Sequence, residues 1–107
     1  EEFAEALTDY HGLVLLSTGL ATYSDIEYAL RIYDSNRQRS KLILMQCTSK
    51  YPTPMEESGV NEIKNLEEMF KIPFGYSDHT RGLSAAKISI VQGAKVIEKH
   101  VNFDLRM

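Results

Sequence analysis

His79 and His100 each follow a short apolar run, and one helix-forming segment separates them. Their spacing of 21 residues is that of one strand–helix unit. We therefore expect the two imidazoles side by side at the carboxyl ends of neighbouring parallel strands, where α/β enzymes bind metals and substrates. Neutral imidazoles bind a borderline divalent ion such as Mn, Zn, Fe or Co, and Asp78 or Glu98 could orient them by hydrogen bonds. An ion with only two protein ligands keeps positions for water and a substrate oxygen, so it can polarise a carbonyl.

Other interpretations of these and further polar residues stay open. The two histidines could be structural, each bonded to a backbone carbonyl, or a general acid and base, because imidazole titrates near neutral pH. Ser17 and Gly19 lie in a small-residue turn before a helix, where free N–H groups and a hydroxyl suit phosphate, and an ordinary turn is the alternative. Tyr51 could cover a substrate or pack over the mouth of the fold. Cys47 ends an apolar run and is interpreted as a buried, inert thiol.

The elements that position these residues recur along the chain. Continuous apolar runs occupy residues 13–16, 42–45, 72–76 and 94–97. Continuous apolarity over a short run indicates a strand covered on both faces, as in a parallel sheet. Helix-forming segments separate the runs, and residues 2–9 resemble the end of a further helix. The predicted order is a helix, three strand–helix units and a last strand.

Each helix-forming segment carries boundary signals and a buried stripe. Thr22 or Ser24 caps the first helix, with Ser24 and Glu27 as a possible capping box. Asn61 is the expected cap of the second helix, and the third should stop at Gly93. The helical period predicts three buried stripes: Ile26, Ala29, Leu30 and Tyr33; Ile63, Leu66, Met69 and Phe70; and Ala85, Ala86, Ile88 and Val91.

Polar residues follow every apolar run at the same end, at 17–19, 47–51, 77–80 and 98–100. Strand ends that share one rim are the usual active-site arrangement of a (β/α)8 barrel. The chain has 107 residues, whereas a complete barrel needs about 250. We therefore predict an α/β fold of parallel strand–helix units, a partial TIM barrel that forms one domain over residues 1–107.

Composition argues against several classes of partner. The net charge is -3, and the Lys and Arg residues are scattered among acidic ones, so no basic stripe is available for nucleic acid. No apolar stretch approaches the roughly 20 residues of a membrane helix. The single cysteine cannot form an internal disulfide, which favours a reducing, cytoplasmic setting.

Four sequence motifs closely resemble successive motifs of the sialic acid synthase family. They are LSTGLAT at 16–22, CTSKYP at 47–52, GYSDHT at 75–80 and GAKVIEKH at 93–100, in the family's order and spacing. The resemblance implies the second half of the family's catalytic barrel, strands five to eight. Members condense phosphoenolpyruvate with N-acetylmannosamine or a related aminosugar. The products are N-acetylneuraminate, legionaminate, pseudaminate or similar nonulosonic acids and phosphate, and spore-coat polysaccharide synthases are similar.

The resemblance also implies roles for individual residues. His79 and His100 match the histidines that hold a divalent cation, usually Mn with Mg or Co as alternatives, which polarises the open-chain sugar aldehyde. Ser17 and Ser77 match serines that bind the phosphate of phosphoenolpyruvate. In the implied mechanism, C3 of phosphoenolpyruvate attacks the metal-bound aldehyde, water adds at C2, and phosphate leaves from a tetrahedral intermediate.

The family's sugar pocket and catalytic groups are only partly represented. Ser49 and Tyr51 match positions that line the aminosugar pocket, although some members have Asn where this chain has Ser49. The family's catalytic glutamate, its phosphate-binding lysines and its antifreeze-like domain have no counterpart in residues 1–107, so no catalytic residue is assigned. We expect the chain alone to be inactive. Its unpaired strand edges should pair with another copy, as in a homo-oligomer, or with the other half of the barrel, or cause aggregation. Another phosphoenolpyruvate-dependent aldol-type synthase and a non-catalytic barrel piece are the alternatives.

Overall fold

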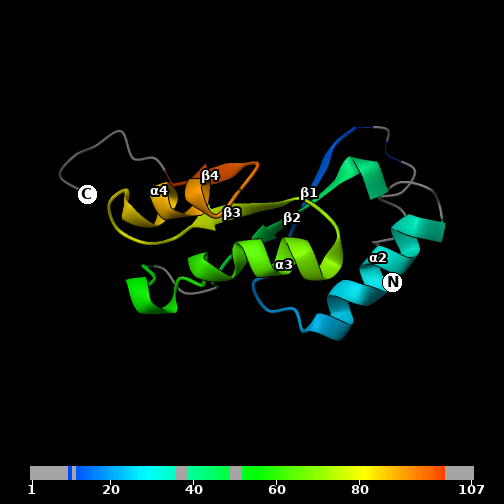
Figure 1. The fold of residues 1–107 in the computed structure, drawn as a ribbon, viewed down its shortest axis with the longest axis horizontal. Helices are drawn as coiled ribbons and strands as arrows, with labels where there is room; N and C mark the ends of the chain where they lie inside the picture. Colours follow the sequence, from blue (N-terminus) through cyan, green and yellow to red (C-terminus); the bar gives the residue numbers. More distant parts are fainter. Residues whose placement is uncertain (1–9, 11, 36–38, 49–51, 101–107) are drawn as a thin grey trace.

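A parallel sheet with strands in chain order forms the centre of the structure (Figure 1). The computed structural model describes Tyr10 and residues 12–35, 39–48 and 52–100. The strands are β1 (Val14–Ser17), β2 (Leu42–Gln46), β3 (Phe74–Asp78) and β4 (Ile97–Lys99). The helices are α2 (Tyr23–Ser35), α3 (Ile63–Phe70) and α4 (Ser84–Val91), with 3-10 turns η1 (Arg39–Lys41), η2 (Met55–Glu57) and η3 (Val60–Glu62). This repetition forms half of a (β/α)8 barrel, which confirms the predicted fold.

The strand register divides the sheet into two faces. Leu42, Leu44, Phe74 and Tyr76 lie on one face, are at most 1% exposed, and form a single core with apolar side chains of α2, α3 and α4. We call this the helix-covered face. Alternate strand residues form the opposite, open face: Leu15, Ser17, Met45, Gly75, Ser77 and Glu98. Because helices surround the outside of a (β/α)8 barrel, the open face corresponds to the barrel interior.

Helix α2 begins with a capping box formed by Thr22 and Asp25. The Asp25 N–H donates to Thr22 Oγ1 (3.2 Å) and the Thr22 N–H donates to Asp25 Oδ2 (2.9 Å). The bond from the Thr22 backbone, and next the Thr22 side chain, lower the pKa of the Asp25 carboxyl. Thr22 is thus confirmed as the cap. The box predicted from Ser24 and Glu27 is wrong, because α2 already contains both residues.

Helix α3 buries a narrower stripe than predicted. Ile63, Leu66 and Phe70 are buried at the expected spacing, but Met69 is 54% exposed. The helix packs through one row of side chains, and Met69 falls beside that row, toward solvent. Asn61 is not the cap, because it lies within η3, which leads directly into α3.

Helix α4 also differs from its predicted stripe. Ala85 and Ser89 are its buried residues, whereas Val91 is 86% exposed. Ser89 tolerates burial because its hydroxyl donates to the Ala86 carbonyl (2.6 Å). Beyond the helix, Gly93 has a φ of 100°, in the left-handed region that glycine adopts readily, so the predicted stop is confirmed.

Strands β3 and β4 lie later in the chain than the predicted runs at 72–76 and 94–97. Their last residues are polar, so side chains expected in loops belong to strands and have a defined face. The helix end predicted for residues 2–9 lies outside the described residues. Within the described ranges, no helix is long and apolar enough to cross a membrane.

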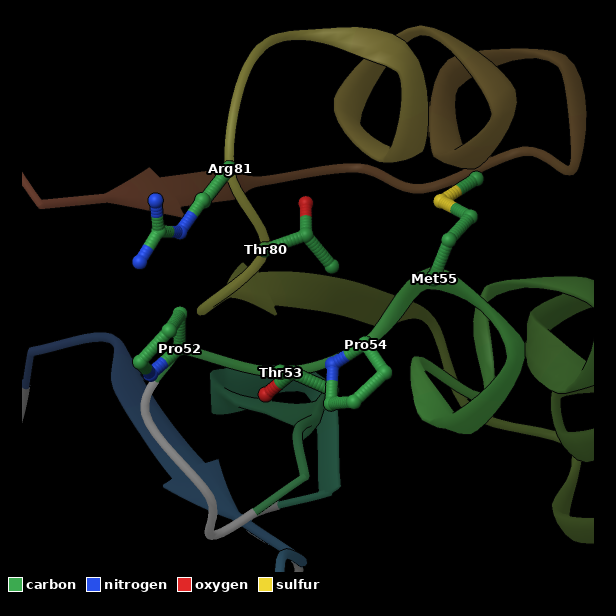
Figure 2. A pocket seen from close by; sticks show the side chains of 6 residues that line it. All are labelled: Pro52, Thr53, Pro54, Met55, Thr80 and Arg81. Atoms are coloured by element: carbon green, nitrogen blue, oxygen red, sulfur yellow. The ribbon is translucent and has the colours of Figure 1, made fainter.

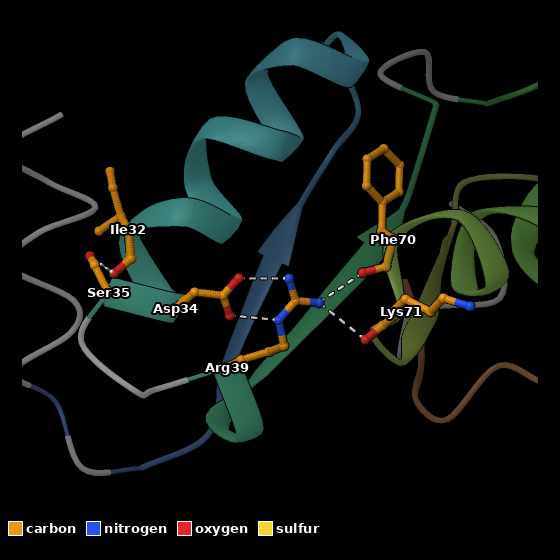
Figure 3. A network of polar contacts seen from close by, with 6 residues as sticks. All are labelled: Ile32, Asp34, Ser35, Arg39, Phe70 and Lys71. Atoms are coloured by element: carbon orange, nitrogen blue, oxygen red, sulfur yellow. Dashed lines mark hydrogen bonds and ion pairs between the residues drawn. The ribbon is translucent and has the colours of Figure 1, made fainter.

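Arg39 joins the ends of α2 and α3, just before β2 and β3 begin (Figure 3). Its guanidinium donates two hydrogen bonds to Asp34 (2.7 and 2.8 Å), which lower the pKa of that carboxyl. Arg39 Nη1 also donates to the Phe70 carbonyl (2.7 Å) and the Lys71 carbonyl (3.1 Å). Carbonyls at a helix end lack intrahelical partners, so one side chain completes α3 and fixes it to α2.

Candidate functional site

His79 and His100 directly follow the last residues of the neighbouring strands β3 and β4. Asp78 pairs with Lys99 in the parallel register, and each histidine is the next residue along its chain segment. Alternation continued one residue past each strand end predicts both imidazoles on the open face. Neighbouring strands are about 4.8 Å apart, so two such imidazoles can reach one ligand. His79 is half-buried and His100 is exposed.

The His79 ring is oriented by the backbone at the end of β2. Its Nδ1 lies 2.9 Å from the Thr48 carbonyl oxygen, which can only accept a hydrogen bond. Nδ1 therefore donates this bond, and in the neutral ring Nε2 is the nitrogen that a metal would bind. The structural interpretation of His79, a bond to a backbone carbonyl, is thus observed. It is compatible with metal binding because the two interactions use different nitrogens.

Cys47 contacts the same imidazole. Its Sγ lies 3.7 Å from His79 Nδ1 and 3.9 Å from Nε2, and the residue is only half-buried. Cys47, predicted to be a buried, inert thiol, is therefore only half-buried and lies against an imidazole. Sequence reasoning missed this contact because it depends on strand register. Met45 pairs with Gly75, so Cys47 aligns with Ser77, two residues before His79 on the neighbouring strand.

Ser77 and Glu98 form a direct hydrogen bond across β3 and β4. The Ser77 hydroxyl donates to Glu98 Oε1 at 2.6 Å, and the two residues are register partners. In this arrangement the serine proton is committed to a carboxylate rather than to an incoming phosphate. The described partner of Glu98 is therefore Ser77. Both residues lie two positions before the histidines that Glu98 was thought able to orient.

Ser17, the other serine expected to bind phosphate, lies at the end of β1. It is exposed on the open face, and the Gly19 N–H makes a long hydrogen bond to its Oγ (3.4 Å). The turn is anchored by Thr18, whose N–H and hydroxyl both donate to the Met45 carbonyl at 3.0 Å. Ser17 and Ser77 share a face, with β2 between their strands. Both serines thus line the open face, but they are not in register: Ser17 is level with Gly75, two residues before Ser77.

Asp78 points away from the open face and into the protein. Its side chain is fully buried, and it accepts hydrogen bonds from Lys99 Nζ (3.0 Å) and from the Thr80 hydroxyl (2.6 Å). Burial acts to raise the pKa of Asp78, but the bonds from Thr80 and Lys99 outweigh it and lower the pKa. The described partners of this carboxylate are therefore Thr80 and Lys99 rather than the His79 ring that it was thought able to orient.

A pocket of about 360 Å³ lies between the loop after β2 and the turn after β3 (Figure 2). Its lining residues are Pro52, Thr53, Pro54, Met55, Thr80 and Arg81. The Thr53 N–H donates to the His79 carbonyl (2.8 Å), which fixes one wall to the candidate site. In Figure 2 the Arg81 side chain extends toward Pro52. The pocket thus combines apolar walls with one guanidinium. Ser49 and Tyr51, predicted to line the aminosugar pocket, lie outside the described residues.

The donor set fits an open divalent-ion site. Among the described residues, no three His, Cys, Asp or Glu side chains cluster closely enough to hold an ion. Two imidazoles at one level, one with its tautomer set by a carbonyl, suit an ion that takes its other ligands from water and substrate.

Comparisons with known proteins agree with the motifs and the fold. The model of the NeuB family matches residues 2–107. An uncharacterised protein of Methanocaldococcus jannaschii is 46% identical over 94 residues, and the N,N'-diacetyllegionaminic acid synthase of Campylobacter jejuni is 40% identical over 95 residues. In both cases the match covers 88% of this chain and 28% of the relative, so the chain spans under a third of their length.

A solved structure supports the same assignment. The N-acetylneuraminic acid synthetase of Leptospira borgpetersenii, crystallised with citrate, superposes with a TM-score of 0.87 at 34% identity. The match covers 96% of this chain and 35% of that one. Family model, relatives and fold therefore agree that the chain belongs to the NeuB family.

Proposed function

We propose that the protein carrying this chain condenses phosphoenolpyruvate with an N-acylated aminosugar to give a nonulosonic acid and phosphate. In this proposal the chain supplies the metal-binding half of the barrel. The observation that carries it is the register pair of Asp78 and Lys99, the residues directly before His79 and His100, together with the 2.9 Å contact between His79 Nδ1 and the Thr48 carbonyl. The family membership and the acid-synthase names of relatives support the reaction class.

His79 and His100 would hold the cation, with Mn as the first choice and Mg or Co as alternatives. When bound, the cation supplies Lewis-acid polarisation of the sugar carbonyl. Ser17 and Ser77 would donate hydrogen bonds to the phosphate of phosphoenolpyruvate. Because Ser77 now donates to Glu98, it must exchange that carboxylate for the phosphate when substrate binds.

The pocket beside His79 is the proposed place for part of the aminosugar. An acylamino group has a hydrocarbon end and a carbonyl oxygen, which would suit the apolar walls at Pro54 and Met55 and the donors of Arg81. Ser49 and Tyr51 would complete this region, as the family resemblance implies. Aminosugars with an N-acyl substituent are therefore proposed as the substrate class.

The test uses the complete natural protein with phosphoenolpyruvate and a panel of N-acylated aminosugars. Phosphate release that depends on both substrates, stops with EDTA and returns with Mn²⁺ is expected. His79→Ala and His100→Ala should each abolish turnover, whereas Asn65→Ala, at an exposed position of α3, should leave it unchanged. Turnover that persists in both histidine variants, or with no aminosugar present, would contradict the proposal.

We also propose that the 107 residues alone are inactive. The described part of the chain offers an ion two imidazoles and no cluster of three potential ligands. The measurement is phosphate release by the purified chain, with the complete protein as the positive control. Substrate-dependent release by the chain alone would show this expectation to be wrong.

A further inference from the structure

We propose that Asp78 and Lys99 are a positioning pair that sets the relative placement of the His79 and His100 imidazoles. The inference rests on the proposed function, in which the two histidines share one cation. Each member of the pair directly precedes one of the histidines, and the two members are register partners. They contact each other on the helix-covered face, and strand alternation predicts the imidazoles of the next residues on the open face.

The ion pair joins the strands where their backbone pairing stops. Lys99 Nζ lies 3.0 Å from Asp78 Oδ2, with the Asp78 side chain fully buried and the Lys99 side chain 27% exposed. The parallel register ends at this same pair, and β4 has only three residues. So short a strand has few backbone hydrogen bonds to hold its end. The side-chain bridge therefore supplies the last fixed connection before the two histidines.

A second set of bonds fixes the backbone on both sides of His79. Asp78 Oδ1 accepts from the Thr80 N–H (2.9 Å) and the Thr80 hydroxyl (2.6 Å), and Lys99 Nζ also donates to the Thr80 carbonyl (3.0 Å). The His79 carbonyl itself accepts from the Thr53 N–H (2.8 Å). The residues flanking His79 are thus bonded to Lys99, the residue before His100. A shift of either strand end would stretch several of these bonds at once.

Burial makes this pair suited to positioning. Charges removed from water interact more strongly, and separating them leaves an uncompensated buried charge. A second ion pair on the approach to β4 lacks this property. Lys95 and Glu67 lie 3.5 Å apart, with the Lys95 side chain 54% exposed, so solvent competes with their contact. Lys95 therefore provides a matched control two residues before the same strand.

The test compares variants of the complete natural protein. Lys99→Met removes the ammonium group. The double variant Asp78→Asn with Lys99→Met also removes the buried charge that could unfold the single variant. Lys95→Met is the control. Mn²⁺ affinity is measured from the electron paramagnetic resonance signal of the free ion, and the imidazoles are followed by NMR of metal-free, ¹⁵N-histidine-labelled protein.

We expect the double variant to keep the wild-type circular dichroism and to bind Mn²⁺ about 10- to 100-fold more weakly, as when a group that orients a metal ligand is lost. The His79 and His100 signals should both shift in the double variant. The control should match wild type in affinity and in both signals. Wild-type Mn²⁺ affinity in the folded double variant would overturn the positioning pair, and so would loss of the wild-type circular dichroism in both Lys99 variants.

Failure of the proposed function would be distinguishable from failure of this inference. If the wild-type protein binds no Mn²⁺, the cation in the proposed function is wrong. The positioning role of Asp78 and Lys99 is then decided by the imidazole signals of the metal-free protein. Shifts of both His79 and His100 signals in the double variant, absent from Lys95→Met, would support the pair. Unchanged signals would overturn it.

Discussion

The Ser77 hydroxyl donates a 2.6 Å hydrogen bond to Oε1 of Glu98, its register partner on the neighbouring strand. A bond of this length is typical of a hydroxyl donating to an ionised carboxylate. Ser77 is buried and Glu98 is exposed, so the serine has one fixed acceptor at the rim of the open face. A phosphate that binds Ser77 would compete with Glu98 for the same proton and would be repelled by its charge.

Glu98→Gln is therefore expected to strengthen binding of phosphate and phosphoenolpyruvate by about 3- to 10-fold, because one negative charge near the anion is removed. Dissociation constants from calorimetry on the complete protein test this. Glu68→Gln, at an exposed position of α3, removes a charge away from the site and should have little effect. Weaker phosphate binding by Glu98→Gln would contradict the proposed competition.

Arg39→Met is expected to lower the free energy of unfolding by about 1–2 kcal/mol. The Asp34 ion pair is partly exposed and contributes little by itself, but the bonds to the Phe70 and Lys71 carbonyls complete the end of α3. Urea unfolding measures the change. Arg31→Met is the matched control, because Arg31 is exposed on α2 and its described contact is with the Tyr28 ring. Equal free energies of unfolding for the two variants would show that the Arg39 bonds to the end of α3 do not stabilise the fold.

Stability should fall in acid partly because of Asp78. Its pKa lies below the ordinary value of 3.8 in the folded protein. A carboxyl with a lower folded pKa stabilises the fold above its unfolded pKa, and this contribution is lost as pH falls through the folded pKa. Asp78→Asn should therefore flatten the decline of unfolding free energy below about pH 4. Asp34→Asn serves as the comparison at a partly exposed carboxyl, and an acid decline that is equally steep in Asp78→Asn and wild type would refute the assignment.

Gly75→Ala is expected to destabilise the fold by about 1–3 kcal/mol, as overpacking in a core does. A Cβ at this position would lie 2.5 Å from Met45 Sδ and 2.7 Å from the Val96 carbonyl oxygen. Adding Met45→Ala should restore only part of the loss, because the Val96 carbonyl belongs to the backbone. Thermal unfolding of the single and double variants measures both steps. Full recovery in the double variant would show that the carbonyl contact is not limiting.

The repeating order of elements was predictable because it depends on local signals. Continuous apolar runs, helical periodicity and Gly93 identified four strands and the helices between them, and the structure confirms that order. The strand ends were placed too early because polar residues such as Ser77 and Asp78 look like loop residues in sequence. Once the neighbouring strand supplies partners, these residues complete the parallel pairing. The prediction that Met69 and Val91 are buried was wrong for a related reason. Helical periodicity identifies the side of a helix that faces the core, but packing decides how many residues on that side are covered.

The amino-acid sequence by itself determined the strand–helix repetition, the family motifs and the spacing that brings His79 and His100 to neighbouring strand ends. Only the tertiary structure decided which groups these residues touch. Ser77 contacts Glu98, Asp78 contacts Lys99, and Cys47 lies beside His79. The physical reason is that such partners depend on strand register and side-chain alternation across separate strands. Each pair is joined over 21 or more residues of chain, beyond the range of any local pattern.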